Sequence, residues 1–299
     1  MDSRYENEFL KGVWNLLYKY QRWLEVELAI IQARENLHMI PDGIYKSISS
    51  KVRVTEDTVE EIAAIEAVSK HDLTAFVSAI QNQLPAEEKK YFHAGGITSY
   101  DIEEPAMALM LLHSTTYIKS LLRSLYFVLI GLAKTYCHTT MIAHTHSQHA
   151  QVYTLGIKLL GYAHDLNNSI HRIELSKQEI SYSKISGVIG TYGDGLTPDI
   201  EYEALKLLEL KRINFSRQIV LRDRVANLIT QIAIAGAIIE KMAIDFRLAA
   251  SSERCELQEK FSRGQKGSSA MPHKKNPINA EKITGMSRLL RGYAMVALE

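Results

Sequence analysis

The chain has 299 residues, of which 46% are hydrophobic, and its 35 basic residues nearly balance 34 acidic ones. This is enough apolar sequence to bury a large core in one or two domains. The net charge of +1 gives no reason to expect nucleic acid or a membrane surface as a partner. Only 6 prolines and 16 glycines interrupt the chain, which disfavours a sandwich or barrel and favours long helices.

The first residues are polar and mixed in charge, which is unlike a secretory signal. No run of about 18 uncharged apolar residues is present, so we expect no membrane span. The two cysteines, Cys137 and Cys255, are therefore expected to be reduced thiols in a cytoplasmic protein.

The N-terminal third of the chain alternates helical patterns with turn residues. Apolar residues recur every three or four positions over 9–38 and predict a helix there. A threonine cap and an acidic first turn predict a second helix over 55–68. A third is expected over 71–85, and a glycine pair then opens a loop over 95–101.

The remaining two thirds of the chain contain three long apolar segments of about 30 residues, each roughly 45 Å long as a helix. Helices of this length need partners in a bundle or across an oligomer interface. The predicted segments are long helices at 105–136, 152–181 and 223–259, a polar break at 138–151, a loop with several glycines at 187–195, a short helix at 201–212, and a last helix beginning near 279.

We therefore predict an all-α fold. A helical N-terminal domain would comprise residues 1–104, and an elongated bundle of long helices would comprise 105–299. A coiled-coil scaffold is the alternative, but the long segments lack clean heptads, and loops rich in histidine and serine interrupt them.

Four groups of residues have the chemistry of a site. The first is the segment 264–277, where small residues stand beside lysines and an asparagine. Glycine and serine allow close backbone approach to a ligand, lysine attracts carboxylates, and a serine alkoxide stabilised by such groups could act as a base. From composition alone, a solvated basic loop is an equally good interpretation.

The second group is 144–149, which holds three histidines within six residues. Imidazole is a common metal ligand, but the cluster contains no acidic residue and its spacing matches no zinc motif. A general acid is the better interpretation, because histidine titrates near neutral pH. We expect no metal and no cofactor.

The other two groups have ordinary structural explanations beside the functional ones. Lys70-His71-Asp72 has the composition of a helix cap with a surface ion pair. Residues 96–101 have the composition of a helix start, and a helix N-terminus also attracts anions.

The order of residues in 267–277 narrows these choices. It reads Gly-Ser-Ser-x-Met-Pro-x-Lys-x-Asn-Pro, and it resembles the signature loop of the fumarase/aspartase superfamily of lyases at every fixed position. The resemblance implies that Ser268 is the general base, that Lys274 and Asn276 bind the carboxylates of a succinyl group, and that Glu281 orients an active-site histidine. Ser269 would lie in the same pocket.

The other groups extend the resemblance. By it, His146 protonates the leaving nitrogen, with His149 beside it in the pocket. Lys70-His71-Asp72-Leu-Thr-Ala-Phe is similar to the segment with which adenylosuccinate lyases supply a substrate-binding histidine, so His71 joins the predicted catalytic residues. Thr98 and Ser99 would bind a substrate carboxylate.

Several details resemble the adenylosuccinate lyase branch in particular. Arg4-Tyr5 is similar to a pair that contacts the nucleotide, and Gln218 falls where a ligand-binding glutamine is found. Residues 184–192 resemble a Lys-Ile-Ser-Gly segment of that branch. Two departures concern histidines, because His144 replaces a usual arginine and His93 is displaced by one residue from a usual histidine before Thr-Ser.

The implied reaction is a β-elimination that releases fumarate from adenylosuccinate to give AMP, and from the succinylated aminoimidazole carboxamide ribotide of purine biosynthesis. The implied assembly is a homotetramer with shared sites, binding a purine nucleotide. Members usually continue into a C-terminal domain with a phosphate-binding segment that this sequence lacks, so we expect weak or no activity from residues 1–299 alone. The alternatives are another lyase of the superfamily, such as argininosuccinate lyase, and an inactive helical scaffold.

Overall fold

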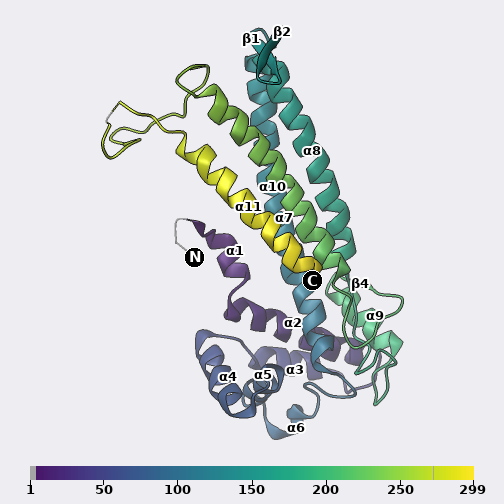
Figure 1. The fold of residues 1–299 in the computed structure, drawn as a ribbon. Helices are drawn as coiled ribbons and strands as arrows, with labels where there is room; N and C mark the ends of the chain where they lie inside the picture. The colour runs from purple at the N-terminus through teal and green to yellow at the C-terminus, as the bar shows by residue number, and fades with distance from the viewer. Residues whose placement is uncertain (1–4, 272) are drawn as a thin grey trace. The chain divides into compact units, whose positions relative to one another are not determined.

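The computed structural model describes residues 5–271 and 273–299, so the predicted nucleotide contact of Arg4 lies outside the described residues. The chain divides into two compact units. The first comprises Met1–Thr116 and Gln178–Leu221, and the second comprises Tyr117–Lys177 and Arg222–Glu299. Helices dominate both units, as the sequence predicts (Figure 1). The predicted domain boundary at 104/105 falls within a helix that contributes to both units, and it stays a prediction.

The first unit is built from short helices around an aromatic and aliphatic core. Trp23, Phe76 and Phe92 are fully buried in it, and the ring of Trp23 meets that of Phe76 edge-on at 5.4 Å between centroids. Its elements are α1 (Glu8–Val13), α2 (Leu16–Asn36), α3 (Ile44–Lys51), α4 (Glu56–Ser69), α5 (Asp72–Gln81), α6 (Ala86–Lys89), the start of α7 (Ser99–Thr135), β3 (Tyr182–Ser183), α9 (Pro198–Leu207) and β4 (Lys211–Arg212).

The second unit is a bundle of long helices. It comprises the rest of α7 with β1 (Thr140–Thr145), β2 (Gln148–Thr154), α8 (Leu155–Ile180), α10 (Asp223–Ala249) and α11 (Ile278–Leu298). Small residues let α10 and α11 pack closely: a Cβ on Gly236 would lie 2.6 Å from a methyl of Leu290, and the hydroxyl of Ser287 donates to the carbonyl of Gly236 at 2.9 Å. Between α8 and α10, the hydroxyl of Tyr162 donates to Asp245.

The local signals at helix starts act as predicted in α4. The side chain of Thr55 accepts from the backbone N–H of Thr58, and the side chain of Thr58 accepts from the backbone N–H of Thr55, so the two form a reciprocal capping box.

The structure corrects several predicted boundaries. Instead of a polar break at 138–151, β1 and β2 form an antiparallel hairpin. The helix predicted over 223–259 ends at Ala249, that over 201–212 is α9 at Pro198–Leu207, and that over 152–181 begins at Leu155 after the hairpin. The helix predicted from residue 105 begins at Ser99. Pro105 thus stands inside α7 without a backbone N–H to donate, and the Asp101 carboxylate accepts from the backbone N–H of Thr98 at the helix start.

Among the residues that the structure describes, two helices, α7 and α10, are long and apolar enough to cross a membrane by length and composition alone. In the structure, 17% of the apolar 18-residue stretch of α7 and 33% of the corresponding stretch of α10 are buried. Much of the apolar surface of the second unit is therefore open, as at Phe127, which is 60% exposed, and Val296, which is 73% exposed.

Candidate active site

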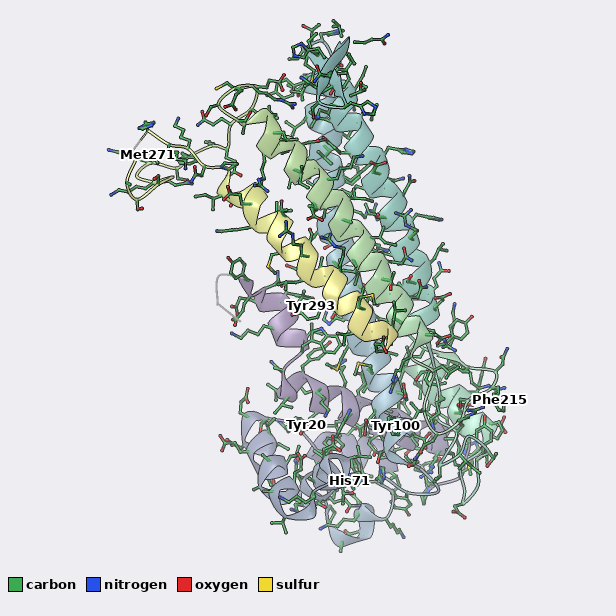
Figure 2. The ribbon with its side chains drawn as sticks, viewed as in Figure 1. Tyr20, His71, Tyr100, Phe215, Met271 and Tyr293 are labelled. Atoms are coloured by element: carbon green, nitrogen blue, oxygen red, sulfur yellow. The ribbon has the colours of Figure 1, made fainter. Side chains whose placement is uncertain are left out.

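The predicted base stands in the loop that joins α10 to α11, here called the Ser268 loop (residues 260–277). Figure 2 shows Met271 of this loop beyond the ends of both helices. The hydroxyl of Ser268 accepts from the backbone N–H of Met271 at 3.2 Å and more weakly from that of Ala270 at 3.4 Å. Two amides aimed at one hydroxyl oxygen stabilise negative charge on it, which is what a serine base needs.

The same loop folds back so that its two arms meet. A Cβ on the buried Gly267 would lie 2.2 Å from the carbonyl oxygen of Lys274 and 3.1 Å from the amide nitrogen of Asn276. The chain therefore packs Gly267, the residue before Ser268, against the backbone of the two residues predicted to bind carboxylates. Glycine is required at 267 because any side chain would displace backbone atoms.

The base of the Ser268 loop is held by a residue that sequence reasoning missed. The carboxylate of Glu259 accepts from the backbone N–H of Asn279 at 3.2 Å and from that of Ala280 at 3.0 Å. The side-chain amide of Asn279 also donates to it at 3.1 Å. Glu259 thus caps the N-terminus of α11 from the other end of the loop, where a negative charge is favoured. Glu281, in the first turn of α11, is exposed.

His146 lies at the turn of the β1–β2 hairpin. It and Ser147 form a two-residue loop with φ values of +52° and +62°, between the paired residues Thr145 and Gln148. Positive φ at both positions is the geometry of the tight turns that suit hairpins. The side chain of His146 is exposed.

The other two histidines of the hairpin face each other across the strands. The rings of His144 and His149 meet edge-on at 5.0 Å between centroids. Within residues 5–271 and 273–299, no group of three or more metal-ligating side chains is assembled. The hairpin joins α7 to α8 and the Ser268 loop joins α10 to α11, and both lie at the same end of the bundle (Figure 1).

In the first unit, His71 is the N-cap of α5. Its Nδ1 accepts from the backbone N–H of Thr74 at 3.4 Å. A neutral imidazole with Nδ1 as acceptor carries its proton on Nε2, so this exposed side chain has a donor free for a ligand. The structural and functional interpretations of His71 are therefore compatible. Lys70 ends α4 in the left-handed conformation, with φ of +56°.

Asp72 belongs to a charged cluster that the sequence did not reveal. The ammonium of Lys19 on α2 lies 3.4 Å from the Asp72 carboxylate and also stands over the ring of Trp23 at 4.3 Å. Glu103, one turn after Ser99 on α7, interacts electrostatically with both Asp72 and Lys19. Burial first, and then the negative charge of Asp72, raise the pKa of Glu103, while Lys19 opposes the shift.

Thr98 and Ser99 stand half-buried at the start of α7. The segment that carries the exposed Gln218 reaches the same helix, because the backbone N–H of Val220 donates to the carboxylate of Glu104 at 3.2 Å. Tyr5 is 40% exposed and precedes α1. The predicted residues thus form two groups, one in each compact unit: Ser268, Ser269, Lys274, Asn276, Glu281, His146 and His149 in the second, and Tyr5, Lys70, His71, Asp72, Thr98, Ser99 and Gln218 in the first.

A family model described as lyase matches residues 5–292 of this sequence. The chain belongs to the lyase family. The adenylosuccinate lyase of Thermotoga maritima is 40% identical over 299 residues, which are the whole chain and 68% of that protein. The adenylosuccinate lyase of Aquifex aeolicus is 38% identical over the same share of each. The prediction of an enzyme of the lyase class is confirmed.

Solved structures at low sequence identity show the same fold. A fumarate lyase from a Mesorhizobium species has a TM-score of 0.84 at 22% identity, covering 97% of this chain and 64% of that one. A 3-carboxy-cis,cis-muconate lactonizing enzyme from Pseudomonas putida has a TM-score of 0.85 at 22% identity, covering 98% and 66%. The chain therefore spans about two thirds of the length of its relatives.

Proposed function

We propose that this lyase eliminates fumarate from adenylosuccinate to give AMP, and that it cleaves the succinylated aminoimidazole carboxamide ribotide in the same way. The names of the relatives support the substrate, because two adenylosuccinate lyases are 38–40% identical to this chain over its whole length. The observation that carries the chemistry is that the Ser268 hydroxyl accepts from two backbone N–H groups, in a loop that packs the adjacent Gly267 against the backbone of Lys274 and Asn276.

The proposed reaction needs one proton removed and one delivered. Ser268 takes a proton from the carbon β to the nitrogen, and the electrons left behind spread into the adjoining carboxylate. Lys274 and Asn276 bind this carboxylate and stabilise the charge where it develops. The carbon–nitrogen bond then breaks, the new carbon–carbon double bond gives fumarate, and His146 delivers a proton to the departing nitrogen.

The residues of the first unit have the remaining proposed roles. Thr98 and Ser99, at the start of α7, bind the second carboxylate of the succinyl group, because a helix N-terminus favours an anion. His71 donates from Nε2 to the substrate, with Lys70 and Asp72 beside it. Arg4, Tyr5 and Gln218 contact the purine nucleotide, Ser269 and His149 line the pocket, and Glu281 orients an active-site histidine. The reaction uses no metal or cofactor.

We further propose that the protein works in the cytoplasm as a homotetramer in which subunits share sites. The apolar surface left open on the second unit, at Phe127 and Val296 for example, supports burial against other copies of the chain. Burial of this surface between subunits would also explain why α7 and α10 are so apolar, without requiring a membrane.

The decisive assay follows the absorbance change on conversion of adenylosuccinate to AMP, with argininosuccinate as the competing substrate, in the full-length protein as its host expresses it. We expect turnover of adenylosuccinate only, and a loss of at least about a thousandfold in Ser268→Ala with unchanged thermal unfolding. Ser262→Ala, in the same loop, is the matched control. Turnover of argininosuccinate alone would reject the substrate, and full activity of Ser268→Ala would reject the mechanism.

A further inference from the structure

The first unit contains a completely buried ion pair whose partners lie far apart in the sequence. The ammonium of Lys184 is 2.8 Å from a carboxylate oxygen of Asp101, and both side chains have no exposed surface. Removing two charges from water costs several kcal/mol per ion, which the pair recovers only if further hydrogen bonds satisfy it. Because such a pair contributes little net stability, its other contacts must be examined to find what else it does.

Those contacts join two separate segments of backbone. One carboxylate oxygen of Asp101 accepts from the N–H groups of Ser186 at 2.9 Å and Gly187 at 3.1 Å. The other accepts from the N–H of Thr98 at 2.9 Å. The ammonium of Lys184 in turn donates to the carbonyl of Gly187 at 3.1 Å. Asp101 therefore fixes the residue before α7 to the glycine loop, here defined as residues 184–196.

The same two segments also meet through glycines. A Cβ on Gly96 would lie 2.3 Å from the carbonyl oxygen of Gly193, and one on Gly95 would lie 3.3 Å from that of Asp194. Gly95 and Gly96 have φ of +66° and +76°. Three contacts therefore set the position of Thr98 relative to the glycine loop. They are the hydrogen bonds of the Asp101 carboxylate to both segments, the Gly96–Gly193 contact and the Gly95–Asp194 contact.

The charge of Asp101 matters for the ligand expected there. A carboxylate two residues after Ser99, left uncompensated, would repel an anion bound at the start of α7. Lys184 cancels that charge from the interior side, so the helix start keeps its preference for anions.

We infer that Asp101 and Lys184 are positioning residues that hold Thr98 and Ser99 in the geometry that binds a substrate carboxylate. The inference rests on the proposed function, in which Thr98 and Ser99 take one carboxylate of the succinyl group. Asp101 supplies the acceptors that fix the backbone, and Lys184 neutralises Asp101 and fixes its orientation. Neither residue touches the substrate.

The test separates positioning from stability by comparing single and double variants of the full-length protein. Asp101→Asn and Lys184→Met each leave one buried charge unpaired, so both should lower thermal stability. The double variant D101N/K184M removes both charges and should regain part of that stability. It cannot regain the full geometry, because the asparagine NH2 group presents donors where one of the two carboxylate oxygens accepted from backbone N–H groups.

For the double variant we expect KM for adenylosuccinate to rise at least about tenfold with kcat changed less than about threefold, the pattern of lost ground-state binding. Amide hydrogen exchange at Thr98, Ser186 and Gly187 should quicken by at least about tenfold, while the interior of α2 keeps its protection. The matched control is Lys51→Met with Glu88→Gln, an ion pair at 2.6 Å in the same unit, which should leave KM unchanged.

Wild-type KM in the double variant would overturn the inference, whether or not exchange at the three amides quickens. Failure of the proposed function gives a different result, namely a wild-type protein that does not turn over adenylosuccinate. In that case, fumarate is titrated against wild type and D101N/K184M while exchange at Thr98 and Ser99 is followed. Protection by fumarate in the wild type alone supports the inference, and equal protection or none in both rejects it.

Discussion

Nδ1 of His93 lies 2.6 Å from a carboxylate oxygen of Glu27, a glutamate with no exposed surface that reaches it from α2. From the same helix, Arg34 donates to the carbonyl oxygens of Ala94 at 2.5 Å and Gly95 at 3.0 Å. The loop that leads to Thr98 is thus held from α2 as well as by Asp101.

This pair predicts a pH dependence of stability. Burial alone lowers the pKa of His93, but the hydrogen bond and charge of Glu27, helped by the charge of Asp101 and opposed by Arg34, raise it above the ordinary value of 6.5. A raised pKa in the folded state stabilises fully below about pH 6.5, and the contribution disappears as pH rises through the folded pKa. The melting temperature of the wild type minus that of Glu27→Gln should therefore shrink from pH 6 to pH 9. His38→Gln, a change at an exposed histidine, should show no such trend, and a constant difference for Glu27→Gln would contradict the assignment.

Gly96→Ala should destabilise the first unit by more than backbone strain alone. Forcing alanine into the left-handed region at φ of +76° costs about 1–3 kcal/mol, and its Cβ would also meet the carbonyl oxygen of Gly193 at 2.3 Å. Gly43→Ala is the matched control, because Gly43 has φ of +89° but nothing within 4 Å of a Cβ. Urea unfolding should show a larger loss of unfolding free energy for Gly96→Ala than for Gly43→Ala. Equal losses would mean that the close contact between Gly96 and Gly193 adds no penalty.

Glu259→Gln should loosen the Ser268 loop without unfolding the bundle. The change removes a charged cap from the start of α11, worth about 0.5–2 kcal/mol locally. We expect faster hydrogen exchange at Asn279 and Ala280 and a several-fold fall in kcat/KM. Glu256→Gln, at an exposed glutamate nearby, should change neither quantity. Unaltered exchange in Glu259→Gln would show that the cap contributes nothing.

His146→Asn tests the proposed acid while sparing the hairpin. Asparagine tolerates the φ of +52° at this position, so the turn should persist, but it supplies no titratable proton. We expect kcat to fall by about 10²–10⁴. Ser147→Asn, at the neighbouring turn position with φ of +62°, should retain activity. If both variants behave alike, the hairpin geometry matters and the imidazole does not.

The sequence was informative where the signal is local. The long helices follow from apolar spacing, the α4 cap from Thr55 and its acidic turn, and the Ser268 loop from one continuous motif. The hairpin was missed because its two-residue turn, His146-Ser147, lacks the glycine or asparagine that usually marks such turns.

The missed site residues act through partners remote in the chain. Asp101 and Lys184 are paired across the fold, as are Glu27 and His93, and no spacing rule joins residues so far apart. In the sequence, Lys184 is only the first residue of the 184–192 segment, and Asp101 is only the last residue of the helix start predicted at 96–101. That an aspartate and a lysine in two motif segments would neutralise each other became visible only when the fold brought them together.

The exposed apolar side chains of the second unit have a thermodynamic consequence. If copies of the chain cover Phe127 and Val296, association stabilises the folded state. The unfolding midpoint then depends on protein concentration. Dilution should lower the melting temperature and expose surfaces that bind hydrophobic dyes. A midpoint that is independent of concentration would place the stability of the bundle within a single subunit.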